Sequence, residues 1–416
     1  MPNGMTVLPK GSEWMYEWRI TAILKPNRPR PSMLGTVLVA MAISCAGVSV
    51  ATAHPVQVVQ SAHLSPTPLF DSGNHSAAVV SALGVLSRGM VLNDERVVLL
   101  DRQTLLFINP RTDELWSSGG QGGGPGEFAG SGLELALFRE QDALTVWDPN
   151  NNFRLTTFSH TGDVLGTRRL DVSSVEFDHI VSAFRLYGVF TDGSLAFVDG
   201  FPRYSDQPGA ADRLPEYLAE VSEDGDKRTI VEFLGAESGD ILFRQSTLVS
   251  VGNDRVAVAD TESKEVMILD QSGELVSRIP MPGEGVTVSE DHLAARLGDA
   301  RERARRSHER TVERFEAMGR STEGFEFEER DYRHNEIAPA IDRMRFDGDG
   351  RLWMRHFVMP GTDTKTWTVW DGGANTFSVD MPASETLLDV MGSLVLLRTR
   401  SELGVDRAVI RELVFR

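Results

Sequence analysis

The stretch Arg-Val-Ala-Val-Ala-Asp at residues 255–260 is followed by Glu-Val-Met-Ile-Leu-Asp at 265–270 and by Ser-Gly-Glu-Leu-Val at 272–276. The first two runs are mainly aliphatic and end at Asp, and the third follows a Ser-Gly pair. This is the pattern of short strands joined by tight turns. The three runs therefore predict an antiparallel meander with two apolar faces to bury.

The same pattern recurs from about residue 78 to the end of the chain. Its six anchors begin at residues 96, 143, 194, 255, 351 and 393. Most intervals are roughly 40–60 residues, as expected when each repeat is one four-stranded propeller blade. Radial stacking of such sheets buries both faces of each blade and leaves only short edges. We therefore expect an all-β, six-bladed β-propeller over residues 78–416, with a long helix inserted between the fourth and fifth blades.

The last blade is one strand short in the sequence pattern. The chain ends in a strand-like run at residues 408–415. We expect residues 78–83 to supply the missing strand and close the ring. Residues 54–77 are rich in Pro, Ser and His, which predicts a linker.

The repeats resemble those of the NHL family of six-bladed propellers from exported bacterial proteins. The sequence Gly-Gly-Gln-Gly-Gly-Gly-Pro-Gly-Glu-Phe at 119–128 looks like the glycine-rich connector that precedes the inner strand of a blade. The family signature Asp-x-x-x-x-Arg is similar to Asp148 to Arg154, with one extra residue, and to Asp260 to Lys264, without the arginine. The resemblance covers nearly all of the chain after residue 53. It implies a fold and no particular activity, because members of the family differ widely in function.

Residues 287–318 have a helical pattern, within an insertion of about 287–332. Thr287 and Glu290 fit a capping box, and apolar residues recur with a period near 3.6. The polar face carries these arginines among glutamates: Arg301, Arg303, Arg305, Arg306, Arg310 and Arg314. We expect them to form salt bridges on a solvated face, with an anionic partner or membrane surface as the alternative. The apolar stripe is expected to pack on the propeller or on a second copy, which would give a homodimer.

An uncharged run at residues 33–53 follows a flank with basic residues and ends in Ala51-Thr52-Ala53. This pattern predicts a secretory leader cleaved after Ala53, so we expect a periplasmic or extracellular protein. Ala-Ile-Ser-Cys at 42–45 offers an alternative in which Cys45 carries a lipid anchor. An uncleaved membrane span is a third alternative, since about 20 apolar residues can cross a bilayer.

The overall composition excludes several classes of function. Asp and Glu number 60 against 42 Lys and Arg, a formal net charge of −18, which argues against nucleic acid as a partner. Cys45 is the only cysteine, so the domain after residue 53 has no disulfide, cysteine zinc site or cysteine nucleophile. The sequence also has no His-Glu-x-x-His or Gly-x-Ser-x-Gly motif.

The connectors that lead into the inner strands of a propeller lie at one face, beside the central channel. On the boundaries above, this places the following candidate ligand-binding residues at the channel mouth: Glu127, Phe128, Asp178, His179, His334, Asn335 and Glu336. We expect a binding module of the cell envelope that holds a small molecule or a protein there, beneath the inserted helix. In the alternative, the protein is a metal-dependent hydrolase or lyase in which His179, Glu127 and His334 hold calcium or zinc, as in propeller lactonases and the NHL-type amidating lyase.

Overall fold

In the computed structural model, the propeller-like part of the chain belongs to the unit at residues 55–416. Within it, the structure describes residues 57–415 except 78–79, 81–82, 113, 131–133, 141–142, 172–184, 200–212 and 374. The predicted leader and Cys45 lie outside the described residues.

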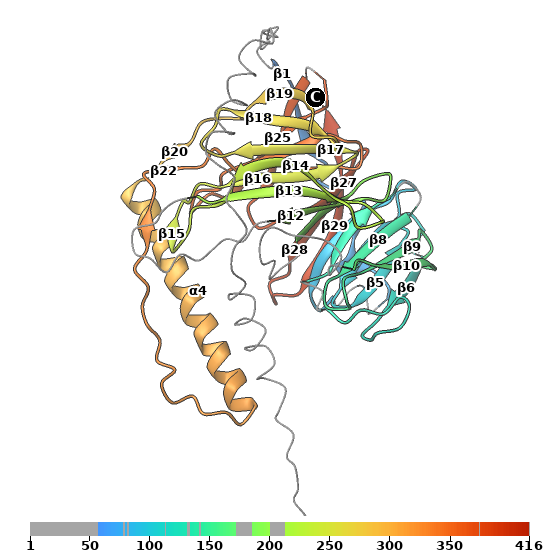
Figure 1. The fold of residues 1–416 in the computed structure, drawn as a ribbon, viewed down its shortest axis with the longest axis horizontal. Coiled ribbons are helices and arrows are strands. Elements are labelled where there is room, and N and C mark those ends of the chain that lie inside the picture. Colours follow the sequence, from blue (N-terminus) through green and yellow to red (C-terminus); the bar gives the residue numbers. More distant parts are fainter. Residues whose placement is uncertain are drawn as a thin grey trace, which may run out of the picture. The chain divides into compact units, whose positions relative to one another are not determined.

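Four antiparallel sheets of four strands each make up the first part of this unit (Figure 1). The first contains β3 (Leu86–Val91), β4 (Val97–Asp101), β5 (Thr104–Ile108) and β6 (Leu115–Gly119); the second contains β7 (Ala136–Arg139), β8 (Ala143–Asp148), β9 (Arg154–Ser159) and β10 (Val164–Arg169). The third contains β11 (Arg185–Val189), β12 (Leu195–Asp199), β13 (Pro215–Val221) and β14 (Lys227–Leu234); the fourth contains β16 (Thr247–Gly252), β17 (Arg255–Asp260), β18 (Glu265–Asp270) and β19 (Leu275–Pro280). Each sheet is a meander, as the repeats predict.

The remaining blade strands form one nine-stranded sheet. Along its path lie β23 (Ile341–Phe346), β24 (Leu352–His356), β25 (Thr364–Trp370), β26 (Asn375–Pro382), β1 (Gln57–Leu64), β29 (Asp406–Phe415), β28 (Leu394–Arg400) and β27 (Thr386–Met391), and β2 (Phe70–Asp71) pairs with β29. The fold is thus an all-β propeller-like arrangement. Among the described residues, four meanders form separate sheets and the last two are joined in one sheet. The sheet pattern therefore does not show six separate blades.

The joining strand corrects the prediction for the N-terminal segment. β1 runs parallel to β26 and antiparallel to the end of β29, so part of the expected linker at 54–77 is strand. Ala62 is buried and Leu64 packs against the same core cluster, which gives this segment an apolar face to bury. The expected closing segment at 78–83 contributes only an isolated bridge, from Leu83 to Asp406. The ring is closed from the N-terminal side, but by residues earlier than expected.

Burial decreases from the second strand of a blade to its outer strand. Every residue of β8 is buried, whereas β10 is almost entirely exposed. Inner strands are covered on both faces because neighbouring sheets pack against them. Between the first two sheets, Phe107 and Phe158 are fully buried in one cluster, and each such side chain contributes about 1.5–3 kcal/mol.

The predicted helix is present as α4 (Glu290–Ala317). Its capping box lies two residues later than expected, at Ser289 and His292, because the backbone N–H of His292 donates to Ser289 Oγ. Two short strand pairs clamp the base of the insertion: β15 (Ile241–Leu242) with β21 (Arg333–His334), and β20 (Val286–Thr287) with β22 (Ile337–Ala338). Figure 1 shows α4 beside β15, with the chain returning along the helix towards β22. None of the helices in the described ranges is both long and apolar enough to cross a membrane.

Candidate functional site

The glycine-rich connector holds Glu127 and Phe128 in structural roles. Phe128 is fully buried and packs against Phe158 with ring centroids 6.1 Å apart, so it belongs to the core and is not open to a ligand. Glu127 accepts a hydrogen bond from the backbone N–H of Gly124 at 2.8 Å, which closes the turn. The prediction of a ligand-binding Phe128 was wrong, because its side chain fills the space between two blades.

Asp148 and Arg154, the residues that resemble the NHL signature in the sequence, form hydrogen bonds with this connector. Asp148 accepts hydrogen bonds from the backbone N–H of Ala129 at 2.7 Å and of Gly130 at 3.1 Å. Arg154 donates to the carbonyls of Gly123 and Gly124. Burial lowers the pKa of Arg154. The signature therefore stabilises a connector and does not form a binding site here.

The other predicted residues fall into two groups. Asp178 and His179 lie outside the described residues, so their place at the channel mouth stays a prediction. His334, Asn335 and Glu336 lie at the base of the α4 insertion, where His334 and Glu336 are exposed. Among the residues that the structure describes, no group of three or more His, Cys, Asp or Glu side chains is arranged to hold a metal ion.

Asn335 positions the connector that faces α4. Its Nδ2 atom donates to Glu237 Oε2 at 2.7 Å and to the carbonyl of Phe243 at 3.1 Å. Phe243 has a positive φ of 56°, a left-handed conformation that is strained for a bulky residue. The hydrogen bond from Asn335 and the buried Phe243 ring hold this conformation, which sets the direction of the next residue, Arg244.

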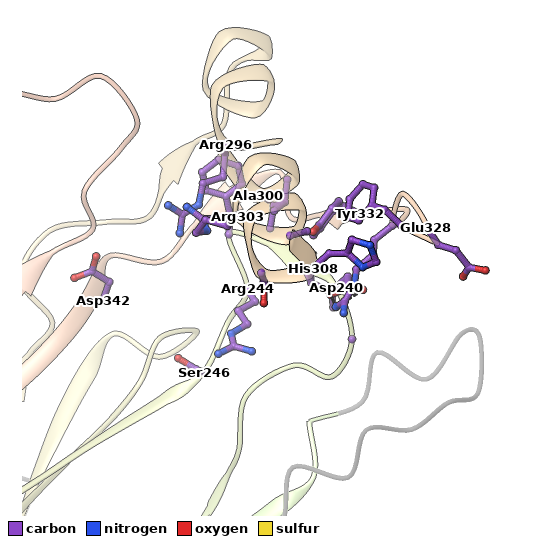
Figure 2. Close-up of a pocket in the computed structure, with 18 of the residues that line it drawn as sticks. Asp240, Arg244, Ser246, Arg296, Ala300, Arg303, His308, Glu328, Tyr332 and Asp342 are labelled. Carbon is purple, nitrogen blue, oxygen red and sulfur yellow. Dashed lines mark hydrogen bonds and ion pairs between the residues drawn. The ribbon is translucent and has the colours of Figure 1, made fainter. Parts of the chain in front are cut away.

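A cavity of about 1150 Å³ lies between α4 and the connector at residues 239–248 (Figure 2). Leu242 and Phe243 on one side and Ala300 on the other are buried in a shared cluster, against which Leu293 and Leu297 of α4 pack. Phe243 and Phe357 lie with ring centroids 6.0 Å apart. The apolar stripe of α4 thus packs on connectors of the propeller, which was one of the two expectations from the sequence. Dimerisation through the helix stays a prediction.

Three arginines give the cavity a positive rim. Arg296 and Arg303 come from α4, and Arg244 comes from the connector beneath the helix (Figure 2). Arg330 also lines the cavity but forms an ion pair with Asp240 at 3.0 Å. Arg244, Arg296 and Arg303 have no hydrogen-bond or ion-pair partner among the described residues. Four carboxylates also line the cavity. Asp240 pairs with Arg330 and Asp342 pairs with Arg355 at 2.6 Å, Glu328 points away from these arginines in Figure 2, and Glu326 is exposed.

The two expectations for the arginines of α4 apply to different faces. Arg301 pairs with Glu329 at 2.6 Å and Arg306 with Glu302 at 2.8 Å, as predicted for a salt-bridged surface. Arg303 faces the cavity instead. Sequence reasoning missed Arg244 and Arg296, since Arg244 lies in an irregular connector and neither residue belongs to a motif. A guanidinium in a partly enclosed cavity is suited to bind carboxylate, sulfonate or phosphate groups.

No protein-family model matches the chain, and no curated protein matches it. The solved structures that resemble it include a Bacteroides fragilis protein named as an exported protein, 12% identical with a TM-score of 0.44, where 87% of this chain covers 98% of that chain. A member of the DUF4221 family from Bacteroides vulgatus is 9% identical with a TM-score of 0.46, covering 86% and 99%. Regucalcin, a calcium-binding protein from Agrobacterium tumefaciens, is 12% identical with a TM-score of 0.32, covering 87% and 94%. Likeness at this level says nothing about ligand or activity, and the NHL resemblance stays an expectation from the sequence.

Proposed function

We propose that the protein is an exported, six-bladed β-propeller that binds an anionic ligand with an apolar part in the cavity between α4 and residues 239–248. The observation that carries this proposal is the set of three unpaired arginines, Arg244, Arg296 and Arg303, around an apolar floor.

The physical chemistry of the cavity favours such a ligand. Small-molecule sites are typically concave and apolar, with a few polar groups that fix orientation. Leu242 and Phe243 would take the apolar part, and the guanidinium groups would take the anionic part. Arginine binds planar anions through two parallel hydrogen bonds, and the low dielectric of a partly enclosed cavity strengthens them.

In this proposal the nine-stranded sheet counts as two blades. The meanders β23–β26 and β27–β29 are each antiparallel, and β1 and β2 add outer pairing to β29. The first strands of successive meanders lie beside one another: β3 beside β7, β7 beside β11, β11 beside β16, and β16 beside β23. β27 lies beside β3, and Arg345 of β23 donates to the carbonyl of Leu388 of β27.

Export rests on the sequence of residues 33–53. We expect the processed protein to begin at His54, in the periplasm or outside the cell, and the mass of the purified chain checks this. A lipid-modified Cys45 at the N-terminus would instead show the lipid-anchored alternative.

The binding proposal is tested with 8-anilinonaphthalene-1-sulfonate, a fluorescent probe that combines an aromatic body with a sulfonate. The protein is expressed from the full-length chain and titrated as the wild type and as the triple variant Arg244→Gln, Arg296→Gln, Arg303→Gln. We expect the variant to bind more than about tenfold more weakly, because each charge-assisted hydrogen bond contributes about 1.5–3 kcal/mol.

A matched control removes three arginines that do not line the cavity: Arg305→Gln, Arg310→Gln, Arg314→Gln. It carries the same change in net charge on the same helix, so it should bind the probe like the wild type. Equal weakening in both triple variants would mean that the probe responds only to overall charge, and the proposed site would be wrong.

A further inference from the structure

A second cavity, of about 800 Å³, lies where turns between first and second strands of the meanders come together. Five of these turns contribute to its lining, through Asn93, Glu140, Thr191, Asn253 and Gly348. The cavity shares no lining residue with the α4 cavity. The two lie at opposite ends of β16 and β23, because residues at the start of both strands line the α4 cavity and the turns after both strands line this one. It is therefore a separate site.

The wall that the second meander gives to this cavity is polar. Thr145 of β8 and Thr157 of β9 are cross-strand neighbours, and their Oγ1 atoms lie 2.8 Å apart. The hydroxyl of Thr145 also donates to Glu140 Oε1. On the other side of Thr157, at Gly166 of β10, a Cβ atom would meet nothing within 4 Å. All four residues line the cavity, so this hydrogen-bonded row opens onto it.

The direction of these hydrogen bonds determines what the wall offers to a ligand. A hydroxyl group has one proton to donate, and a carboxylate only accepts. Because Thr145 donates its proton to Glu140, the bond between the two threonines must be donated by Thr157. Glu140 Oε2 has no hydrogen-bond partner among the described residues. Glu140 Oε2 and Thr157 Oγ1 therefore offer acceptors only, which suit a ligand group that donates.

The two arginines of the lining do not neutralise Glu140. Arg139 forms an ion pair with Asp389, and Arg168 forms one with Glu223. Glu140 itself has no ion-pair partner in the part of the chain that the structure describes. Its negative charge is therefore left for a ligand to compensate.

Asp254 adds a second carboxylate to the lining. Its Oδ1 atom accepts from the backbone N–H of Thr191 at 2.8 Å, and its Oδ2 atom accepts from the hydroxyl of Thr191. No described cation pairs with Asp254. The charges of this cavity that lack an opposite partner are therefore all negative, in contrast to those of the α4 cavity.

The cavity also has an apolar part. Leu155 and Phe190 are buried, and their side chains belong to the core beneath the cavity. Leu165, on the outer strand β10, is 61% exposed and lines the same cavity. An exposed leucine of this kind gains free energy when a carbon chain covers it.

We propose that this cavity binds an aliphatic amine, with the ammonium group on Glu140 and Thr157 and the carbon chain against Leu165. An ammonium group has three N–H donors and no acceptor, which complements the two free acceptors. It also brings the positive charge that Glu140 lacks, and a hydrogen bond between charged groups is roughly twice as strong as a neutral one. An alcohol could donate to the same atoms but would leave the charge of Glu140 uncompensated.

The fluorescent amine dansylcadaverine is the probe for this site. The protein is expressed from the full-length chain and titrated with the probe at constant ionic strength, as the wild type and as Glu140→Gln. Glutamine can still accept the hydrogen bond from Thr145, so the variant removes the charge and keeps the contact. We expect Glu140→Gln to bind the probe at least about tenfold more weakly.

The matched control is Glu114→Gln. Glu114 is an exposed glutamate that also accepts a hydrogen bond from a threonine, Thr112, at 3.1 Å, but it does not line the cavity. Glu114→Gln should bind the probe like the wild type. Equal weakening in both variants would mean that the probe responds only to overall charge, and the proposal would be wrong.

A second pair of variants tests the apolar contact without touching the hydrogen-bonded row. Leu165→Gln should weaken binding several-fold, whereas Leu275→Gln, at a 48% exposed leucine of the outer strand β19, should not. Both side chains are exposed, so both variants should fold and melt like the wild type. Wild-type affinity in both Leu165→Gln and Glu140→Gln would contradict the proposed site.

Competition identifies the group that is recognised. Hexylamine should displace the probe from the wild type, and hexanol, which has the same chain length and no charge, should not. Displacement by both to the same extent would show that the cavity takes a carbon chain and not an ammonium group, which would overturn the proposal.

The two probes keep this inference apart from the proposed function. Glu140→Gln should bind 8-anilinonaphthalene-1-sulfonate like the wild type, and the Arg244, Arg296, Arg303 triple variant should bind dansylcadaverine like the wild type. Loss of dansylcadaverine binding in the triple variant alone would place the amine in the α4 cavity and contradict the site at Glu140.

Discussion

The glycine-rich connector at residues 119–135 and the α4 connector at residues 281–340 both lead into inner strands. They differ in whether their charged side chains have hydrogen-bond partners. In the first, Asp148, Arg154 and Glu127 all bond to the connector's own backbone. In the second, Arg296 and Arg303 face a cavity without partners. The residues that resemble the NHL signature thus stabilise the first connector, whereas arginines without partners beside an apolar cluster mark a candidate site in the second.

The largest expected effect is on the scaffold side of this comparison. Asp148→Ala removes a fully buried carboxylate and leaves the N–H groups of Ala129 and Gly130 without their acceptor. We expect a loss of about 2–4 kcal/mol in the free energy of unfolding, measured by urea denaturation, with sulfonate binding unchanged. Asp163→Ala, in an exposed turn, is the control. A stable Asp148→Ala protein with impaired sulfonate binding would break the comparison.

Asn335→Ala is expected to affect both stability and binding, because Asn335 donates hydrogen bonds to Glu237 and to the carbonyl of Phe243 beside the cavity. We expect it to cost about 1–2 kcal/mol of stability and to weaken sulfonate binding several-fold by releasing the strained Phe243 and, with it, Arg244. Denaturation and fluorescence titration on the same sample measure the two effects. An effect on stability alone would mean that the backbone conformation of Phe243 does not position Arg244.

Metal removal sharpens the comparison against the hydrolase or lyase alternative. Binding of the sulfonate rests on arginines, so dialysis against a chelator should leave its affinity unchanged within about twofold. Elemental analysis of the same sample reports any calcium or zinc. A loss of binding that either ion restores would favour the metal-dependent alternative.

The smallest expected effect is a pH dependence at His356, which lies next to Gly283 at the start of the α4 connector. Burial lowers the pKa of His356 below its ordinary value of 6.5, against a weaker opposing effect of Asp380. Between the folded and unfolded pKa values the unfolded chain binds more protons, so stability is present above pH 6.5 and is lost as pH falls below it. The fall in melting temperature from pH 7.5 to 5.5 should therefore be smaller in His356→Gln than in the wild type. An equal fall would assign the effect to other groups.

The sequence pattern was a good guide to the blades. All six anchors fall at the start of a second strand, which begins at Val97, Ala143, Leu195, Arg255, Leu352 or Leu394. The long helix was also predicted to within a few residues. These features follow from local periodicity, which a single segment carries by itself.

What could not be predicted depends on segments far apart in the sequence. β1 is recognisable as a strand only once β26 and β29 provide edges for it to pair with. Phe128 ends a glycine-rich connector that was expected to place it at the channel mouth, yet it packs between two blades. Arg244 and Arg303 line one cavity from elements that no short motif connects.

The most direct test of the proposed function is to locate a bound ligand in a crystal of the protein grown with a bromine-substituted naphthalenesulfonate. The account predicts a bromine anomalous peak between α4 and Phe243, with the sulfonate against Arg244, Arg296 or Arg303. A saturated crystal with the peak elsewhere, or with no peak, would contradict it.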